Sequence, residues 1–158
     1  MIKHKGQEGF SLIELLIVVA IIGIIASIAI PSLLASRRAA NEASAKSSLR
    51  TISSCEATYL ATDGGGNYGD LAELGAHTLT DVVLSSGSKG GYKFVVTPVT
   101  GATAEFWAYG IPETASGVGQ TGTRRFAIAE DGVLRGDDTL TAPADYDAVN
   151  PGMPAIGN

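Results

Sequence analysis

The sequence has 158 residues and a formal net charge of −5, which allows one modest globular domain besides a membrane segment. The charge is uneven. Residues 35–60 carry four basic and two acidic side chains, net +2, whereas residues 62–158 carry five basic and twelve acidic side chains, net −7. The acidic part argues against nucleic acid as its main partner. Cys55 is the single cysteine, which excludes an intrachain disulfide.

The first element in chain order is a long apolar helix that carries one charge, on Glu14. Residues 15–36 contain no ionisable side chain and are mostly Ile, Leu, Val and Ala. A helix of this length measures about 33 Å, which is enough to cross the apolar core of a bilayer. An acid in such a segment costs free energy, so it indicates a functional residue with a specific partner.

That partner would be created by cleavage of the chain. Gly9 is small and follows a basic start, and a cut between Gly9 and Phe10 would leave a new α-amine on Phe10. Such an amine is mostly cationic at neutral pH, because its ordinary pKa is about 7.7–8.0. Glu14 lies four residues further on, about one helical turn. Its carboxylate could therefore pair with the amine of its own chain or with that of an adjacent copy.

These residues resemble the amino-terminal signature of type IV pilins and of the related pseudopilins of type II secretion systems. The resemblance covers about the first 50 residues and includes Gly9, Phe10, Glu14, Gly23 and Pro31. It implies a leader peptide of residues 1–9, removed after Gly9 by a prepilin peptidase and methyltransferase that also N-methylates Phe10. It further implies that an inner-membrane assembly platform builds identical subunits into a helical filament. Methylation keeps the amine charged, so pairing with Glu14 survives it.

An ordinary cleaved secretory signal is the simplest alternative for this region. It would explain the basic start, the apolar stretch and the suitably spaced small residues Ser27 and Ala29. However, the apolar run exceeds the usual length of about 7–15 residues, it contains an acid in its first turns, and a cut after Ala29 would fall just before Ile30 and Pro31. An uncleaved signal anchor fits the length but gives no reason for Glu14.

The charges that flank the span set its orientation poorly. Lys3 and Lys5 precede it, and Arg37 and Arg38 follow it, so the positive-inside comparison is close to a tie. The resemblance implies that the leader faces the cytoplasm. The expected location is then the bacterial inner membrane, as a single-pass protein in contact with lipid, and afterwards the extracellular pilus.

Two residues are expected to weaken the apolar helix. Pro31 removes a backbone donor, which predicts a kink, and Gly23 has low helix propensity. In related filaments the helix can loosen between this glycine and this proline, and the resemblance implies the same for Gly23 to Pro31. Alternatively, Gly23 allows close packing between helices.

The helix is expected to have two functionally different halves. Residues 10–36 would be the transmembrane and filament-core half, and residues 37–61 an amphipathic half. A stripe at helical spacing predicts the face that packs on a globular domain; its members are Ala45, Leu49, Ile52, Glu56 and Tyr59. Asp63 and the glycines at 64–66 are expected to end the helix.

Residues 62–136 are expected to form a small antiparallel β-sheet head. The predicted class is therefore α+β with a pilin fold, a long amino-terminal helix packed on the sheet. Strands are predicted at 92–97 and 104–109, with a hairpin of 125–130 and 133–135 around an Asp131-Gly132 turn. A short helix is predicted at 71–74. Residues 137–158 are expected to be irregular, either draped on the surface or partly disordered.

The sequence offers little for catalysis, and we expect no enzymatic activity, cofactor or metal. His77 is the only histidine outside the leader, and a pair with Cys55 would lack a third group; Cys55 is more simply a buried small residue. Many type IV pilins close a carboxy-terminal loop with a disulfide, and this chain departs from that pattern. The four acids of the tail could gather around calcium, but a solvated acidic tail is the simpler interpretation; they are Asp137, Asp138, Asp145 and Asp147.

Three functions compete. The first is a structural subunit of a type IV pilus, used for twitching motility, adhesion or DNA uptake. The second is a pseudopilin of a type II secretion system, which the amino terminus cannot distinguish from a pilin. The third is a membrane-anchored enzyme or small-ligand-binding domain, which the lack of a reactive cluster disfavours.

Overall fold

The structure is a computed structural model that describes residues 10–99, 101 and 103–156. It divides into two compact parts between Ser36 and Arg37, and each part is described by itself. The predicted leader, residues 1–9 with Gly9, lies outside the described residues. The part that begins at Arg37 is called the globular part below.

Helix α1, Leu12–Ala61, is the longest element, with 50 residues, and it belongs to both parts. Gly23 and Pro31 lie inside it. It ends where the sequence predicts, because Gly65 and Gly66 adopt positive φ angles of 57° and 89° that residues other than glycine rarely take up.

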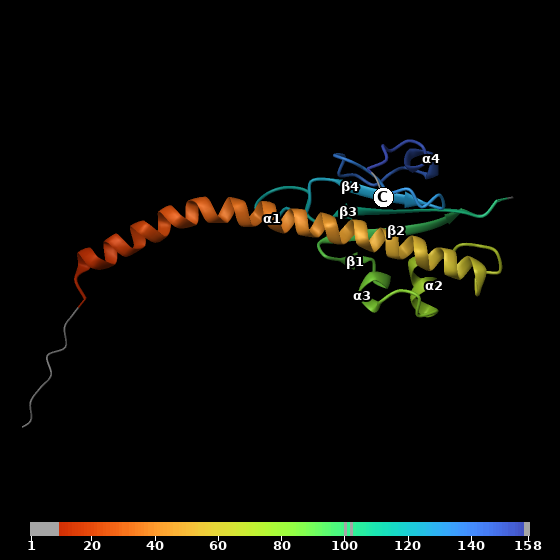
Figure 1. Cartoon of the computed structure of the whole chain (residues 1–158), viewed down its shortest axis with the longest axis horizontal. Helices are drawn as coiled ribbons and strands as arrows, with labels where there is room; N and C mark the ends of the chain where they lie inside the picture. The colour runs from red at the N-terminus through yellow and green to blue at the C-terminus, as the bar shows by residue number, and fades with distance from the viewer. Residues whose placement is uncertain (1–9, 100, 102, 157–158) are drawn as a thin grey trace, which may run out of the picture. The chain divides into compact units, whose positions relative to one another are not determined.

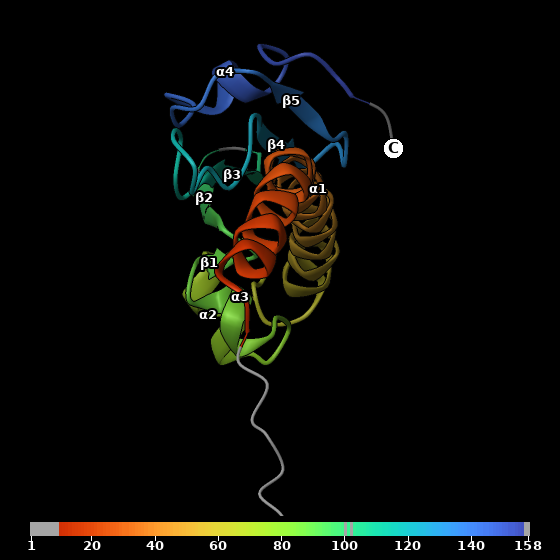
Figure 2. The ribbon, with the colours of Figure 1, turned by 90° about the vertical axis from the view of Figure 1, so that its left-hand side faces the viewer.

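The globular part contains a five-stranded antiparallel sheet in the order β1-β2-β3-β4-β5, with each strand paired to its neighbour in sequence. The strands are β1 Ser88–Lys89, β2 Tyr92–Val99, β3 Glu105–Pro112, β4 Arg125–Ala129 and β5 Arg135–Asp137. Three short helices complete it: α2 Leu71–Ala76, α3 Val82–Ser85 and α4 Tyr146–Val149. Figures 1 and 2 both show α2 and α3 beside the β1 end of the sheet and α4 beside the β5 end. The predicted α+β class is confirmed.

One face of the sheet packs against α1. The predicted stripe is confirmed, because all five of its residues are buried: Ala45, Leu49, Ile52, Glu56 and Tyr59. Ala45, Leu49 and Ile52 share one core cluster with residues of β2, β3 and β4, among them Phe106 and Phe126. Burial of aliphatic and aromatic side chains at this seam contributes roughly 1.5–3 kcal/mol per residue.

The opposite face of the sheet is covered by the carboxy-terminal segment. Alternate residues of a strand point to opposite faces, so Trp107 lies on the other side of β3 from Phe106. Trp107 forms a second cluster with Val149 and Met153, which expose 0% and 3% of their surface. Residues 138–156 are irregular except for α4 and an isolated bridge between Ala155 and Arg135, and Val149 and Met153 of this segment cover the sheet.

The β4–β5 hairpin differs from its prediction. Strand β5 starts at Arg135 rather than at 133, and Arg125 pairs with Asp137. The turn is wider because the Asp131 carboxylate accepts the backbone N–H of Val133 at 3.0 Å and also binds Arg135. These bonds keep residues 131–134 out of the β4–β5 hydrogen-bond ladder. The prediction of a tight two-residue turn is therefore wrong.

The segment between α1 and the sheet contains more helix than predicted. The predicted helix at 71–74 is present as α2, which starts with a capping box: Asp70 accepts the N–H of Glu73, and Glu73 accepts that of Asp70. Helix α3 was not predicted. Its cap, Asp81, accepts the N–H of Leu84 at 2.9 Å and is the sequence signal that would have indicated it.

Candidate functional site: the amino-terminal helix

The start of α1 brings Glu14 close to the residue that would become the new amino terminus. The Glu14 carboxylate turns back along the helix, and its Oε2 accepts the backbone N–H of Ser11 at 3.0 Å. Ser11 is one residue from Phe10, whose side chain is 85% exposed. The carboxylate thus caps the first turn of the helix, one residue from the predicted new amino terminus. Ser11 was not singled out from the sequence, because no residue pattern marks a backbone donor.

The rest of the amino-terminal part, up to Ser36, exposes an apolar surface that no other described residue covers. Ile13, Ile28 and Leu33 expose 63%, 73% and 68% of their surface, and α1 holds a stretch long and apolar enough to cross a membrane, none of which is buried in the structure. Exposed apolar area of this size is unfavourable in water. It requires a lipid or protein surrounding.

Gly23 and Pro31 both lie within the continuous helix. A Cβ added at Gly23 would meet nothing within 4 Å, so packing inside this chain does not require a glycine there. Pro31 cannot donate the backbone hydrogen bond that an ordinary residue would supply. Both residues are therefore compatible with close contacts to neighbouring helices or with local deformation of α1.

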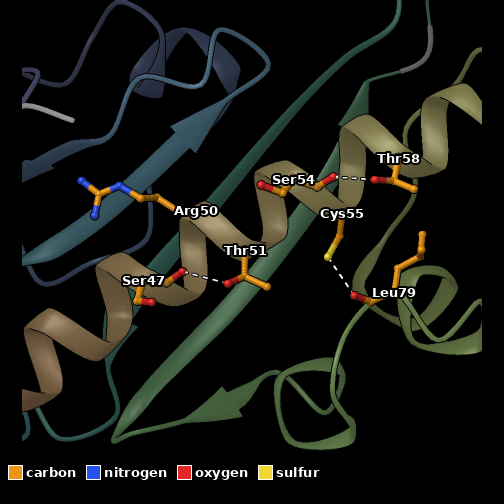
Figure 3. A pocket seen from close by; sticks show the side chains of 7 residues that line it. All are labelled: Ser47, Arg50, Thr51, Ser54, Cys55, Thr58 and Leu79. Carbon is orange, nitrogen blue, oxygen red and sulfur yellow. Dashed lines mark hydrogen bonds between the residues drawn. The ribbon is translucent and has the colours of Figure 1, made fainter.

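The globular part has a shallow groove along the outer side of α1, which Figure 3 shows. Its lining is mostly hydroxyl residues: Ser47, Arg50, Thr51, Ser54, Cys55, Thr58 and Leu79. Thr51 and Thr58 donate to the backbone oxygens of Ser47 and Ser54 in the previous turn. In Figure 3 the Arg50 side chain extends away from Leu79. The two threonine hydroxyls are thus engaged by their own helix, and the groove lining contains no His, Asp or Glu that could act as a base.

Cys55 and His77 have separate partners. The Cys55 thiol donates to the backbone oxygen of Leu79 at 2.9 Å and is 9% exposed, and burial raises its pKa. His77 instead faces Asp63, with Nδ1 3.2 Å from Oδ2, and its ring lies edge-on to Tyr59. The structure thus gives Cys55 the predicted buried position and does not pair it with His77.

Three of the four acids singled out in the carboxy-terminal segment have their own partners in the structure. Asp137 pairs with Arg125 and Asp138 with Arg124, while Asp145 caps α4 by accepting the N–H of Ala148. Among the described residues no group of three or more His, Cys, Asp or Glu side chains is arranged to hold a metal ion.

Comparison with known proteins finds relatives of the amino-terminal segment and of a larger part of the chain. Residues 4–30 match the family described as the prokaryotic N-terminal methylation motif. The type IV wide pilus major component PilA4 of Thermus thermophilus is 58% identical over 38 residues, which is 24% of this chain and 29% of that protein. The type IV major pilin protein PilA of Myxococcus xanthus is 33% identical over 116 residues, 73% of this chain and 48% of that protein. No solved structure matches the chain significantly.

The motif and the fold define a prepilin-type protein, in which an exposed apolar helix continues into an α+β globular part. The motif and the two relatives support the assignment of the chain as a type IV pilin. It spans less than half the length of each of the two curated relatives it matches.

Proposed function

We propose that this chain is a structural subunit of a type IV pilus. It is made with leader residues 1–9, cut between Gly9 and Phe10 by a prepilin peptidase, N-methylated on Phe10 and passed by an inner-membrane platform into a helical filament. The observation that carries this proposal is the amino-terminal part of α1, an apolar surface with one acid at its start. Both relatives are named as major pilus components, which supports the same role here.

Two successive environments cover the apolar surface in this proposal. Before assembly, residues 10–36 span the inner membrane, with the leader in the cytoplasm and the globular part outside. After assembly, the same surface packs against copies of itself in the filament core. The side chains exposed on residues 10–36 are apolar and suit both environments. Neither the lipid nor the filament core contains water that could solvate polar side chains.

Glu14 sets the axial register of the filament. Its carboxylate lies at the helix start, bonded to Ser11, where the charged amine of Phe10 in its own or an adjacent copy can neutralise it. An unpaired carboxylate in an apolar core is strongly unfavourable, so arrangements that leave Glu14 without the amine are disfavoured. Gly23 and Pro31 let the helix pack closely or loosen as subunits enter the core.

A pseudopilin of a type II secretion system remains the second candidate, because the same amino-terminal chemistry serves both assemblies. Deletion of the gene distinguishes them. Loss of long surface filaments, with this chain identified in filaments sheared from the parent strain, supports the pilin. Filaments that persist in the deletion strain together with loss of exoprotein secretion would overturn it in favour of the pseudopilin. Motility, adhesion and DNA uptake assays on the same strain then assign the role of the filament.

A further inference from the structure

Glu56 is a carboxylic acid enclosed in the globular part. It exposes 0% of its surface. Its Oε2 accepts one hydrogen bond, from the backbone N–H of Gly69 at 3.0 Å, and its Oε1 has no hydrogen-bond partner in the part of the chain that the structure describes. No cation pairs with it among those residues. Burial penalises the ionised form of such a group far more than the neutral form.

The titratable groups that act on Glu56 are acids, tyrosines and a cysteine, and none of them carries a positive charge. Asp70 and Glu73 face it from the start of α2, and burial followed by these two acids raises its pKa to about 7, although the Gly69 N–H acts in the opposite direction. The remaining titratable neighbours are Tyr59 and Cys55 on α1 and Tyr68 in the connecting segment; the pKa of each is raised, first by burial and then by nearby acids that include Glu56. His77, at the end of α2, lies beyond Tyr59 and faces Asp63.

The bond from Gly69 attaches the segment of residues 62–70 to α1. This segment leads from the end of α1 to the capping box of α2. A Cβ at Gly69 would lie 2.9 Å from the Tyr59 ring, so the backbone runs directly over that ring. The Gly64 N–H also donates to the Tyr59 oxygen of α1 at 2.7 Å, and the Asp63–His77 contact at 3.2 Å joins the segment to the end of α2. The Glu56 carboxyl therefore stands under the end of the segment nearest to α2.

We propose that Glu56 is a proton-controlled clasp, which keeps residues 62–70 closed on α1 while it is protonated and lets them open when it is ionised. Ionisation places an unpaired charge in a buried site beside Asp70 and Glu73, and opening of the segment returns that charge to water. This inference is independent of the proposed filament role, because it concerns the globular part whether or not the chain is assembled.

The direction of the pH dependence follows from linkage. An acid with a raised pKa in the closed state binds its proton more tightly there than in the open state. The closed state is therefore most favoured at acidic pH. It loses stability as pH rises from the ordinary glutamate pKa, about 4.3, to the raised value of about 7, and changes little above that.

Amide hydrogen exchange of the full-length protein in detergent micelles tests the proposal. Exchange in residues 62–70, corrected for the intrinsic effect of pH and compared with β3 and β4, should quicken by roughly tenfold or more between pH 5.5 and 8.5. Glu56→Gln should abolish this change, because an amide does not titrate. Asp138→Asn, at an exposed acid far along the chain, should retain the wild-type change.

A wild-type segment whose protection does not change with pH would overturn the proposal, as would a Glu56→Gln protein that keeps the wild-type dependence. If Glu56→Gln does not fold, the titration of the Glu56 carboxyl in the wild-type protein tests the proposal instead. Carbon-13 NMR of selectively labelled glutamate should give a midpoint for Glu56 well above the ordinary value. An ordinary midpoint would contradict the clasp.

Discussion

Arg125 and Asp137 face each other across β4 and β5 and form two parallel hydrogen bonds, Nε to Oδ1 and Nη2 to Oδ2, both 2.8 Å long. Arg125 also donates to the backbone oxygen of Thr141 at 2.8 Å. One side chain thus ties the last strand and the segment beyond it to the sheet. Arg135 makes a second such tie, because its guanidinium binds both Asp131 and Asn150. Polar contacts hold the carboxy-terminal segment in a chain that has a single cysteine.

Replacing Arg125 by Met should lower the free energy of unfolding by about 2 kcal/mol, because the partly buried Asp137 loses both charged hydrogen bonds. Urea unfolding of the full-length protein in micelles, followed by the fluorescence of Trp107, measures the change. Arg124→Met is the matched control. It removes an exposed pair with side chains 54% and 85% accessible, and it should cost less than about 0.5 kcal/mol.

The contribution of the Arg125–Asp137 pair should disappear in acid. The Arg125 guanidinium holds the pKa of Asp137 below its usual range. A lowered pKa means that the stabilisation is present above the ordinary aspartate pKa, about 3.9, and is lost as pH falls through the lower value of the folded state. The stability difference between wild type and Arg125→Met should therefore narrow below about pH 4. A difference that stays constant down to pH 2 would contradict this assignment.

The packing of the carboxy-terminal segment against the Trp107 face of the sheet should contribute to the free energy of unfolding. Met153→Ala removes a side chain that is 3% exposed in the cluster with Trp107, and it should cost about 2–3 kcal/mol. Ile156→Ala, at a side chain that is 38% exposed, should cost less than about 1 kcal/mol. Equal effects of the two substitutions on the urea midpoint would show that the segment does not pack as described.

The loop after β3 should fix the first turns of α1 within the globular part. Glu42 Oε1 accepts both the backbone N–H of Thr123, at 2.8 Å, and its hydroxyl, at 2.7 Å, and Asn41 donates to the Thr121 oxygen at 2.8 Å. Glu42→Ala should cost about 1–2 kcal/mol and Thr123→Val about half of that, because the latter keeps the backbone bond. Hydrogen exchange of α1 near residue 42 should quicken in the same order. Unchanged exchange in Glu42→Ala would refute the anchoring role.

Local sequence patterns predicted the elements whose partners are near in sequence. The helical spacing from Ala45 to Tyr59 identified the buried face of α1, including Glu56, because period alone decides which residues share a face. The same reasoning placed β2, β3 and β4 and the end of α1. It also led to Glu14 and Phe10, since a lone acid in an apolar helix is conspicuous.

Local sequence patterns could not predict contacts between residues that are far apart in the sequence. Val149 and Met153 cover Trp107 from about forty residues away, and few apolar residues mark the segment that carries them. The Asp131-Gly132 pair predicts a tight turn, but the Asp131 side chain is engaged by Val133 and Arg135, which no propensity encodes. The Glu56 oxygen that has no partner among the described residues likewise depends on how residues 62–70 fold back.

Substitution at Glu14 separates its two possible contributions. Glu14→Gln can still accept the Ser11 N–H but carries no charge, whereas Glu14→Leu loses both properties. If charge pairing with the Phe10 amine sets register, both variants should insert in the membrane and both should yield at least tenfold fewer filaments. Ile21→Leu should assemble normally. Wild-type filament yield in Glu14→Gln would reduce the role of Glu14 to capping its own helix.

The amino terminus of the filament subunit is the most direct test of the proposed assembly. Mass spectrometry of subunits from sheared filaments should find a chain that begins at Phe10 and carries one added methyl group on its α-amine, so that the cationic partner of Glu14 arises only after processing. A subunit that retains residues 1–9, or that begins anywhere other than Phe10, would contradict the account.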